Sequence, residues 1–84
     1  MDKTDENLAI DGLPMSIAWH PNGKLIAFGS SNGNVYLLGA ETGEVRVLLT
    51  GAHTDQVRTV SFNHDASLLA SGSYDNTAAI WKLD

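Results

Sequence analysis

The sequence predicts an all-β fold built from two similar sheet units, and three observations support this prediction. The two halves align without a gap when Trp19 is matched with Phe62, 43 positions later. Short runs of strand-forming residues are separated by turn residues throughout. Several runs are continuously apolar, which is typical of a sheet covered on both faces. The aligned pairs are Ser16/Thr59, Ile17/Val60, Trp19/Phe62, Leu25/Leu68, Ile26/Leu69, Ala27/Ala70, Gly29/Gly72, Ser30/Ser73, Asn32/Asp75 and Leu37/Ile80.

A repeat of about 40–45 residues with several short strands is typical of a β-propeller blade. One blade cannot cover both faces of its own sheet, so it stacks on neighbours. We expect an acidic N-terminal tail over residues 1–13, a first blade over 14–50 and a second blade over 51–84. Two four-stranded antiparallel blades, the second lacking its last strand, form a partial β-propeller.

Within the N-terminal tail, residues 8–10 are a candidate short strand, and the first unit then begins with a strand over residues 14–19. Pro14 is compatible with this strand because a first strand position needs no ladder donor. The following His-Pro-Asn-Gly segment predicts a hairpin turn, in which Asn22 and Gly23 supply the positive φ values.

The other predicted strands are separated by further turns rich in glycine and asparagine. In the first unit they are residues 24–30, 35–38 and 45–50, and in the second unit 57–62, 67–72 and 77–82. The second unit therefore has three strands against four in the first. Its third strand is expected to leave an unpaired edge, which invites pairing with another strand.

Composition restricts the function classes. The 84 residues carry a net charge of −5 with five scattered Lys and Arg residues, which argues against a nucleic-acid partner. There is no cysteine, so neither a disulfide nor a thiolate metal site is expected. No apolar run reaches the ~20 residues of a membrane helix. We expect a cytoplasmic protein, with the nucleus left open, and no cofactor.

Short motifs in the second unit carry a family resemblance. Residues 51–53 (Gly-Ala-His) stand for a Gly-His element, residues 57–62 match a first-strand pattern, and 71–75 match the second strand and its turn. Residues 80–82 read Ile-Trp-Lys where a Trp-Asp dipeptide usually stands, with lysine replacing the aspartate. Over residues 14–83 the chain thus resembles the WD-repeat (WD40) β-propellers, with a degenerate first repeat.

The resemblance implies a structural tetrad of His53, Ser71, Asp75 and Trp81. The chemistry of these side chains agrees, because a buried indole N–H needs an acceptor. A serine hydroxyl can accept from the indole and donate to an imidazole, whose other nitrogen can meet a carboxylate. The first unit has Ile10, Phe28, Asn32 and Leu38 at these positions. That unit is expected to rely on apolar packing instead.

Two other interpretations of the polar residues are weaker. His53, Ser71 and Asp75 are also the residue types of a hydrolase triad, but no nucleophile elbow surrounds the serine, so we predict no catalytic residue. His20, His53 and His64 could be offered as metal ligands, but no acidic or cysteine residue completes a known spacing, so we predict no metal site.

The resemblance also implies a binding rim at the mouth of the central channel. Arg58 and Tyr74 lie at positions that face this mouth, where F-box substrate receptors of the family bind phosphorylated peptides through arginines. Met15 and Ser31 occupy the same positions in the first unit. An exposed arginine that only meets solvent is the alternative interpretation of Arg58.

We therefore expect a non-catalytic protein–protein interaction scaffold whose partners are proteins or peptides, among them acidic or phosphorylated ones. The acidic net charge raises the association rate with basic partners but does not by itself provide specificity. The alternatives are a small-molecule or glycan-binding propeller, an enzyme accessory domain, or an excerpt of a longer propeller protein. The bare outer sheets predict either a cyclic homo-oligomer of three or four copies that completes a propeller, or a poorly folded isolated chain.

Overall fold

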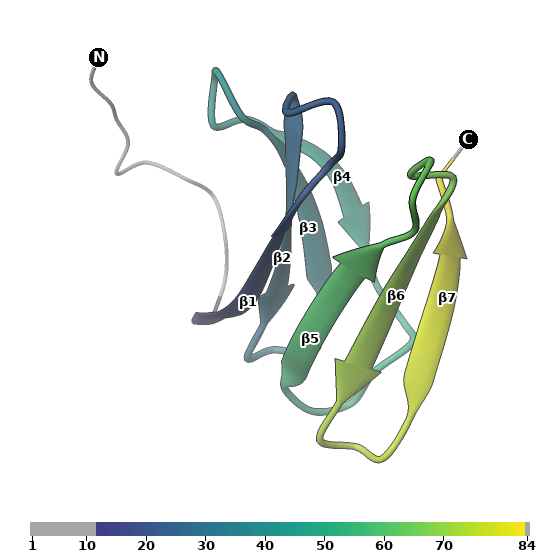
Figure 1. Cartoon of the computed structure of the whole chain (residues 1–84). Helices are drawn as coiled ribbons and strands as arrows, with labels where there is room; N and C mark the ends of the chain where they lie inside the picture. Colours follow the sequence, from purple (N-terminus) through teal and green to yellow (C-terminus); the bar gives the residue numbers. More distant parts are fainter. Residues whose placement is uncertain (1–11, 84) are drawn as a thin grey trace.

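The computed structural model describes residues 12–83, in which seven strands form one four-stranded and one three-stranded antiparallel sheet (Figure 1). Both sheets follow the chain order, β1-β2-β3-β4 and β5-β6-β7. The strands are β1 (Pro14–Trp19), β2 (Leu25–Ser30), β3 (Val35–Gly39), β4 (Val45–Leu49), β5 (Val57–Phe62), β6 (Leu68–Ser73) and β7 (Ala78–Lys82). The predicted all-β class and its four-plus-three strand pattern are confirmed. The candidate strand at 8–10 lies outside the described residues.

The β1–β2 turn differs from the expectation in one respect. Gly23 has a positive φ of 73°, but Asn22 does not adopt a positive φ. Asn22 instead stabilises the turn through its side chain, because its Oδ1 accepts a hydrogen bond from the Lys24 amide at 2.7 Å. In the second sheet the position equivalent to Gly23 is held by Ala66, which has a φ of 61°.

Three β-bulges interrupt the strand pairing, and each leaves one extra residue. These residues are Met15 in β1, Arg46 in β4 and Arg58 in β5. A bulge turns a side chain away from the regular alternation of the strand. Both arginines of the chain therefore lie at bulges. The bulges in β1 and β5 are equivalent, so the sequence repeat extends to the details of the backbone.

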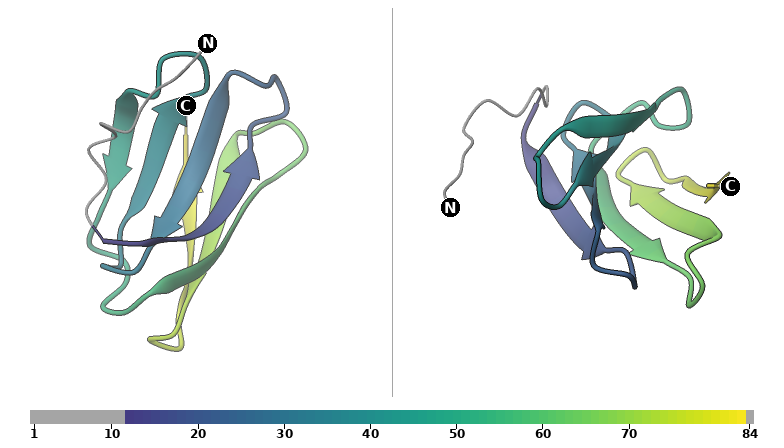
Figure 2. Two further views of the ribbon diagram at one scale, coloured as in Figure 1. Left: turned by 90° about the vertical axis from the view of Figure 1, so that its left-hand side faces the viewer. Right: turned by 90° about the horizontal axis from the view of Figure 1, so that it is seen from above.

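The hydrophobic core lies between the two sheets, which pack face to face (Figure 2). Its buried members come from β2 and β3 on one side and from β5 and β6 on the other. They are Ala27, Val35, Leu37, Val57, Val60 and Leu69, each at most 9% exposed. Each sheet thus covers one face of the other, and the interface between the sheets is the core of the fold.

The opposite faces of the two sheets carry exposed apolar side chains. Ile17 and Trp19 on β1 are 57% and 60% exposed, and Ile80 on β7 is 66% exposed. Within residues 12–83, β7 pairs only with β6, so its other edge is open. No helix in this part of the chain is long and apolar enough to cross a membrane.

Candidate functional site

A buried hydrogen-bonded relay connects the loop before β5 to β6 and β7. Trp81 Nε1 donates to Ser71 Oγ at 2.9 Å, and Ser71 Oγ lies 2.8 Å from Nε2 of His53. An indole N–H can only donate, so Ser71 accepts this bond. His53 Nδ1 lies 3.4 Å from the Asp75 carboxylate, which only accepts, so Nδ1 carries the ring proton and Ser71 gives its own hydrogen to Nε2. This assigns His53 to the tautomer that carries its proton on Nδ1.

The relay continues through a residue that the sequence analysis did not single out, Thr77. His53 Nδ1 lies 3.0 Å from Thr77 Oγ1 and 3.4 Å from Asp75 Oδ2. The Thr77 hydroxyl donates to Asp75 Oδ1, so its lone pair is free to accept from the Nδ1–H. The signal for Thr77 was its position two residues after the turn aspartate, where a side chain can return to the carboxylate.

Asp75 is held by several donors and joins two loops. Its carboxylate accepts from the Thr54 amide at 2.8 Å and from the Thr77 amide at 2.9 Å, besides the Thr77 hydroxyl. These bonds, the one from the Thr77 hydroxyl above all, lower the pKa of Asp75 well below its ordinary value of 3.8. The ionised carboxylate therefore ties the β6–β7 turn to the loop before β5.

The geometry of the relay does not suit nucleophilic catalysis. Ser71 is 2% exposed, and the imidazole of His53 is fully covered. The Ser71 hydroxyl already uses its hydrogen and a lone pair within the relay, whereas a catalytic serine must reach a substrate carbonyl. The contacts between the four predicted residues support a structural role, which we retain as a proposal.

The first sheet has no relay of this kind at the equivalent positions that the structure describes. Phe28 and Leu38 replace the serine and the tryptophan, and Ile10 lies outside the described residues. Asn32 keeps the turn function, because its Oδ1 accepts from the Asn34 amide at 3.0 Å, and its Nδ2 also donates to the Tyr36 hydroxyl at 3.2 Å. The serine and tryptophan of the second sheet's relay thus have no polar counterpart at positions 28 and 38.

The Arg58–Tyr74 rim, formed by these two side chains, is the exposed part of the candidate site. The guanidinium carbon of Arg58 lies 4.7 Å from the centroid of the Tyr74 ring, a cation–π geometry. Arg58 Nη1 also donates to Gln56 Oε1 at 3.2 Å. Tyr74 is 58% exposed, and no carboxylate within residues 12–83 forms an ion pair with Arg58. The guanidinium is oriented and keeps donors for a ligand.

The other two predicted rim residues occupy equivalent places in the first sheet. Met15 is the bulge residue of β1, as Arg58 is of β5. Ser31 follows β2, and its Oγ accepts from the Leu13 amide at 2.8 Å. β1 and β5 are neighbouring strands. The structure thus brings Arg58 and Tyr74 into contact and places Met15 and Ser31 at the same positions one sheet away.

His20 has a local structural role in the β1–β2 turn. The His20 ring packs edge-on against Phe62 with ring centroids 5.2 Å apart, and its Nδ1 accepts from the Asn22 amide. In the described part of the chain, no group of three or more His, Cys, Asp or Glu residues could hold a metal ion.

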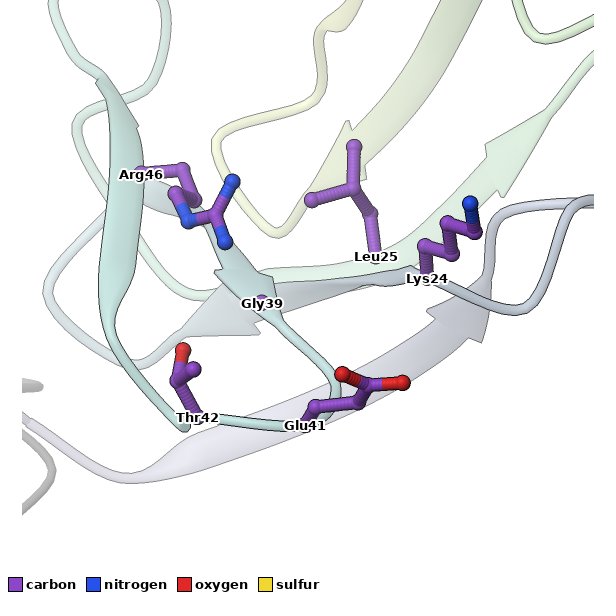
Figure 3. A pocket seen from close by; sticks show the side chains of 6 residues that line it. All are labelled: Lys24, Leu25, Gly39, Glu41, Thr42 and Arg46. Carbon is purple, nitrogen blue, oxygen red and sulfur yellow. The ribbon is translucent and has the colours of Figure 1, made fainter.

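An open pocket of about 330 Å³ lies beside the β3–β4 turn (Figure 3). Arg46, the bulge residue of β4, contributes to its wall. The lining residues are Lys24, Leu25, Gly39, Glu41, Thr42 and Arg46. Leu25 is the only large apolar side chain among them, whereas small-molecule sites are mostly lined by apolar and aromatic groups.

Comparison with known proteins decides the family. The sequence profile described as "Anaphase-promoting complex subunit 4 WD40 domain" matches residues 3–54, and that of "WD domain, G-beta repeat" matches residues 44–82. The chain belongs to the WD-repeat family. Its four-plus-three strand pattern is accordingly that of two neighbouring WD-repeat blades, a partial propeller.

Similar WD-repeat proteins are much longer than this chain. The chain is 38% identical over 68 residues to "Periodic tryptophan protein 2 homolog" of Schizosaccharomyces pombe, covering 80% of the chain and 8% of that protein. It is 38% identical over 78 residues to "Echinoderm microtubule-associated protein-like 2" of Homo sapiens, covering 89% of the chain and 11% of that protein. The β-propeller domain of Myceliophteria thermophila Cps50 (Swd1) superposes with a TM-score of 0.82 at 23% identity, over 93% of the chain and 24% of that domain.

The WD repeat in the sequence does not coincide with one sheet. The G-beta repeat match over 44–82 contains β4, the last strand of the first sheet, and all three strands of the second sheet. This WD repeat therefore contributes strands to both sheets.

Proposed function

We propose that this WD-repeat chain is a non-catalytic protein-interaction module that binds acidic or phosphorylated peptides at the Arg58–Tyr74 rim. The observation that carries the proposal is the state of Arg58. Its guanidinium is exposed on a bulge, is held over the Tyr74 ring, and has no carboxylate partner within residues 12–83.

The chemistry of this rim suits an anionic group at short range. A guanidinium presents paired donors that match a carboxylate or a phosphate in two parallel hydrogen bonds. The Tyr74 ring restricts the guanidinium before the ligand arrives, so less side-chain entropy is lost on binding. The net charge of −5 repels acidic peptides at long range, so the recognition depends on direct contact with Arg58.

Peptide binding tests the proposal. A panel of phosphoserine and phosphothreonine peptides, with their unphosphorylated and glutamate-substituted versions, would be titrated against the chain by fluorescence anisotropy. We expect Arg58→Glu to weaken binding of the best anionic peptide at least about tenfold, which corresponds to about 1.4 kcal/mol. Arg58→Lys should restore only part of the affinity, because an ammonium group cannot form the paired bonds.

Lys24→Glu is the matched control, because it makes the same change of charge on an exposed lysine in the pocket beside the β3–β4 turn. Circular dichroism would show that each variant keeps the fold. Equal loss of binding in Lys24→Glu and Arg58→Glu would contradict a site at Arg58, and so would equal affinity for phosphorylated and neutral peptides.

The remaining parts of the proposal concern the setting of this site. The tetrad of His53, Ser71, Asp75 and Trp81 is proposed to hold the second blade together, and the chain is proposed to work within a ring of blades formed by several copies. A cytoplasmic location belongs to the same proposal, and microscopy of the tagged chain tests it. The alternative function, binding of a glycan or another small molecule, is tested by calorimetric screening of glycans and metabolites. The pocket beside the β3–β4 turn is lined by no aromatic residue, which does not favour this alternative.

A further inference from the structure

The interface between the two sheets pairs small residues with large ones. The small-residue face belongs to the first sheet and consists of Ala18, Ala27 and Gly29, together with the larger Val35 and Leu37. The large-residue face belongs to the second sheet and consists of Val60, Phe62, Leu69 and Trp81. The small residues let the two sheets approach, and the large side chains fill the space between them.

The sequence repeat reproduces both faces on the outside of the molecule. The positions equivalent to the small-residue face are Ser61, Ala70, Gly72, Ala78 and Ile80, on the outward side of the second sheet. The positions equivalent to Val60, Phe62 and Leu69 are Ile17, Trp19 and Ile26, on the outward side of the first sheet. The pattern of small against large residues is thus kept, with one face at each end of the pair.

Burial differs sharply between the equivalent positions. Leu37 is 3% exposed in the interface between the sheets, whereas its counterpart Ile80 is 66% exposed. Val60 is 9% exposed, whereas its counterpart Ile17 is 57% exposed. Ile17, Trp19 and Ile80 therefore present, uncovered, the kinds of side chains that the interface buries, whereas Leu38, the counterpart of Trp81, is itself only 2% exposed.

Two equivalent glycines show the same difference. A Cβ atom on Gly29 would lie 2.6 Å from Cγ1 of Val57 and 2.8 Å from its carbonyl oxygen, so only glycine admits β5 at this distance. A Cβ atom on Gly72 would meet only Thr59 Oγ1 of its own sheet, at 2.9 Å. Glycine within a strand weakens it and often marks the close approach of another backbone. Gly72 thus provides the recess, and within residues 12–83 nothing fills it.

We propose that a second copy of the chain docks head to tail, placing its Ile17, Trp19 and Ile26 on the Ser61, Ala70, Gly72 and Ile80 face of the first. This inference deepens the proposed ring by naming the two faces that meet. By the same equivalence, Pro14 of the second copy takes the place beside Gly72 that Val57 takes beside Gly29. The contact is heterologous, because each copy uses a different face, so repetition closes a ring when the rotation allows it.

One turn departs from the equivalence. A Cβ atom on Gly33 would lie 2.8 Å from the carbonyl oxygen of His53, but the equivalent residue in the second sheet is Asn76, with a φ of 74°. The β6–β7 turn therefore meets the second copy less closely than the β2–β3 turn meets the second sheet. The apolar centre of the two faces carries the contact.

Light scattering coupled to size-exclusion chromatography tests the assignment with the full chain. We expect the wild type to give a mass above that of one chain that rises with concentration. Trp19→Lys and Ile80→Lys should each behave as single chains with unchanged circular dichroism, because both side chains are exposed in the isolated chain. Val47→Lys, which changes a 41% exposed residue on the inner side of β4, should assemble like the wild type.

Mixing the two variants is the decisive measurement. Trp19→Lys keeps an intact outward face on its second sheet, and Ile80→Lys keeps one on its first sheet, so an equal mixture should form a complex of one copy of each. If Trp19→Lys fails to fold, Ile17→Lys replaces it on the same face.

Each contrary outcome identifies a different error. A wild type that stays a single chain at every concentration overturns both the ring and the faces. Assembly that survives the lysine substitutions leaves the ring but overturns the faces. Variants that stay apart when mixed overturn the head-to-tail arrangement. Peptide binding at Arg58 is measured separately, so its failure is distinguishable from all three.

Discussion

Replacing Ser71 with alanine is expected to remove the centre of the relay while leaving β6 in place. The substitution takes the donor from His53 Nε2, whose ring is fully covered, and the acceptor from the half-buried N–H of Trp81. A buried polar group left without a partner costs about 1–3 kcal/mol, and water can partly compensate the more accessible indole. We therefore expect the free energy of unfolding to fall by about 2–4 kcal/mol.

Urea titration followed by far-UV circular dichroism measures this loss. The protein concentration must be the same for all variants, because the proposed assembly would stabilise the chain in a concentration-dependent way. Ser61→Ala is the matched control, since it makes the same chemical change on the exposed, outward side of the same sheet. Because Ser61 also lies in the face proposed to dock a second copy, all titrations use a concentration at which light scattering shows single chains. Its unfolding free energy should stay within about 0.5 kcal/mol of the wild type, with equal m-values throughout.

A double-mutant cycle with His53→Ala separates the relay from simple packing. Once Ser71 has been replaced, His53 Nε2 has already lost its partner, so the second substitution should cost less than it does alone. Full additivity of the two losses would refute the relay. A loss for Ser71→Ala no larger than that for Ser61→Ala would refute it as well.

Further predictions concern pH and backbone conformation. Because the folded-state pKa of Asp75 is depressed, its stabilising contribution is complete above the ordinary value of 3.8 and is lost as the pH falls toward the folded-state value. In urea titrations the stability gap between wild type and Asp75→Asn should be widest near neutral pH and shrink below about pH 4, and a gap that grows on acidification would contradict this. Gly23→Ala should cost about 1–2 kcal/mol in thermal unfolding, because its φ is 73° and no neighbour lies within 4 Å of the added carbon, so the cost is backbone strain alone. Ala66→Gly should relieve similar strain and raise the melting temperature, unless the loss of its buried methyl group dominates, which a decrease would reveal. Gly29→Ala should cost about 1–3 kcal/mol by forcing the sheets apart. Gly72→Ala should keep the fold but reduce the mass seen by light scattering; a folded variant that assembles like the wild type would count against Gly72 as a contact.

The strands were predictable because their signals are local. Turn residues punctuate the apolar runs, and each predicted strand bound within the described residues agrees with the structure to within one residue. The tetrad positions and the Arg58–Tyr74 pair came from motif resemblance, and the structure brings both sets into hydrogen-bonding or ring contact.

Other details depend on side-chain hydrogen bonds in turns and on strand irregularities, which the residue pattern does not specify. Asn22 was expected to have a positive φ, but its side chain bonds to the Lys24 amide and lets Gly23 alone turn the chain. Thr77 belongs to the relay because the β6–β7 turn places its hydroxyl between the His53 imidazole and the Asp75 carboxylate. Arg46 lines the pocket because it is the bulge residue of β4, and no sequence pattern predicted this bulge.

The connection between the sheets has a mechanical consequence. In the described part of the chain the backbone crosses from one sheet to the other once, over residues 50–56, and His53 lies in that segment. Its side chain is anchored in the second sheet, while its carbonyl oxygen abuts Gly33 of the first. The crossing segment is therefore hydrogen-bonded to the second sheet on one side and packed against the β2–β3 turn on the other. In the proposed ring, any change in the angle between the two sheets would be repeated in every copy, so the geometry of this crossing would set how many copies fit.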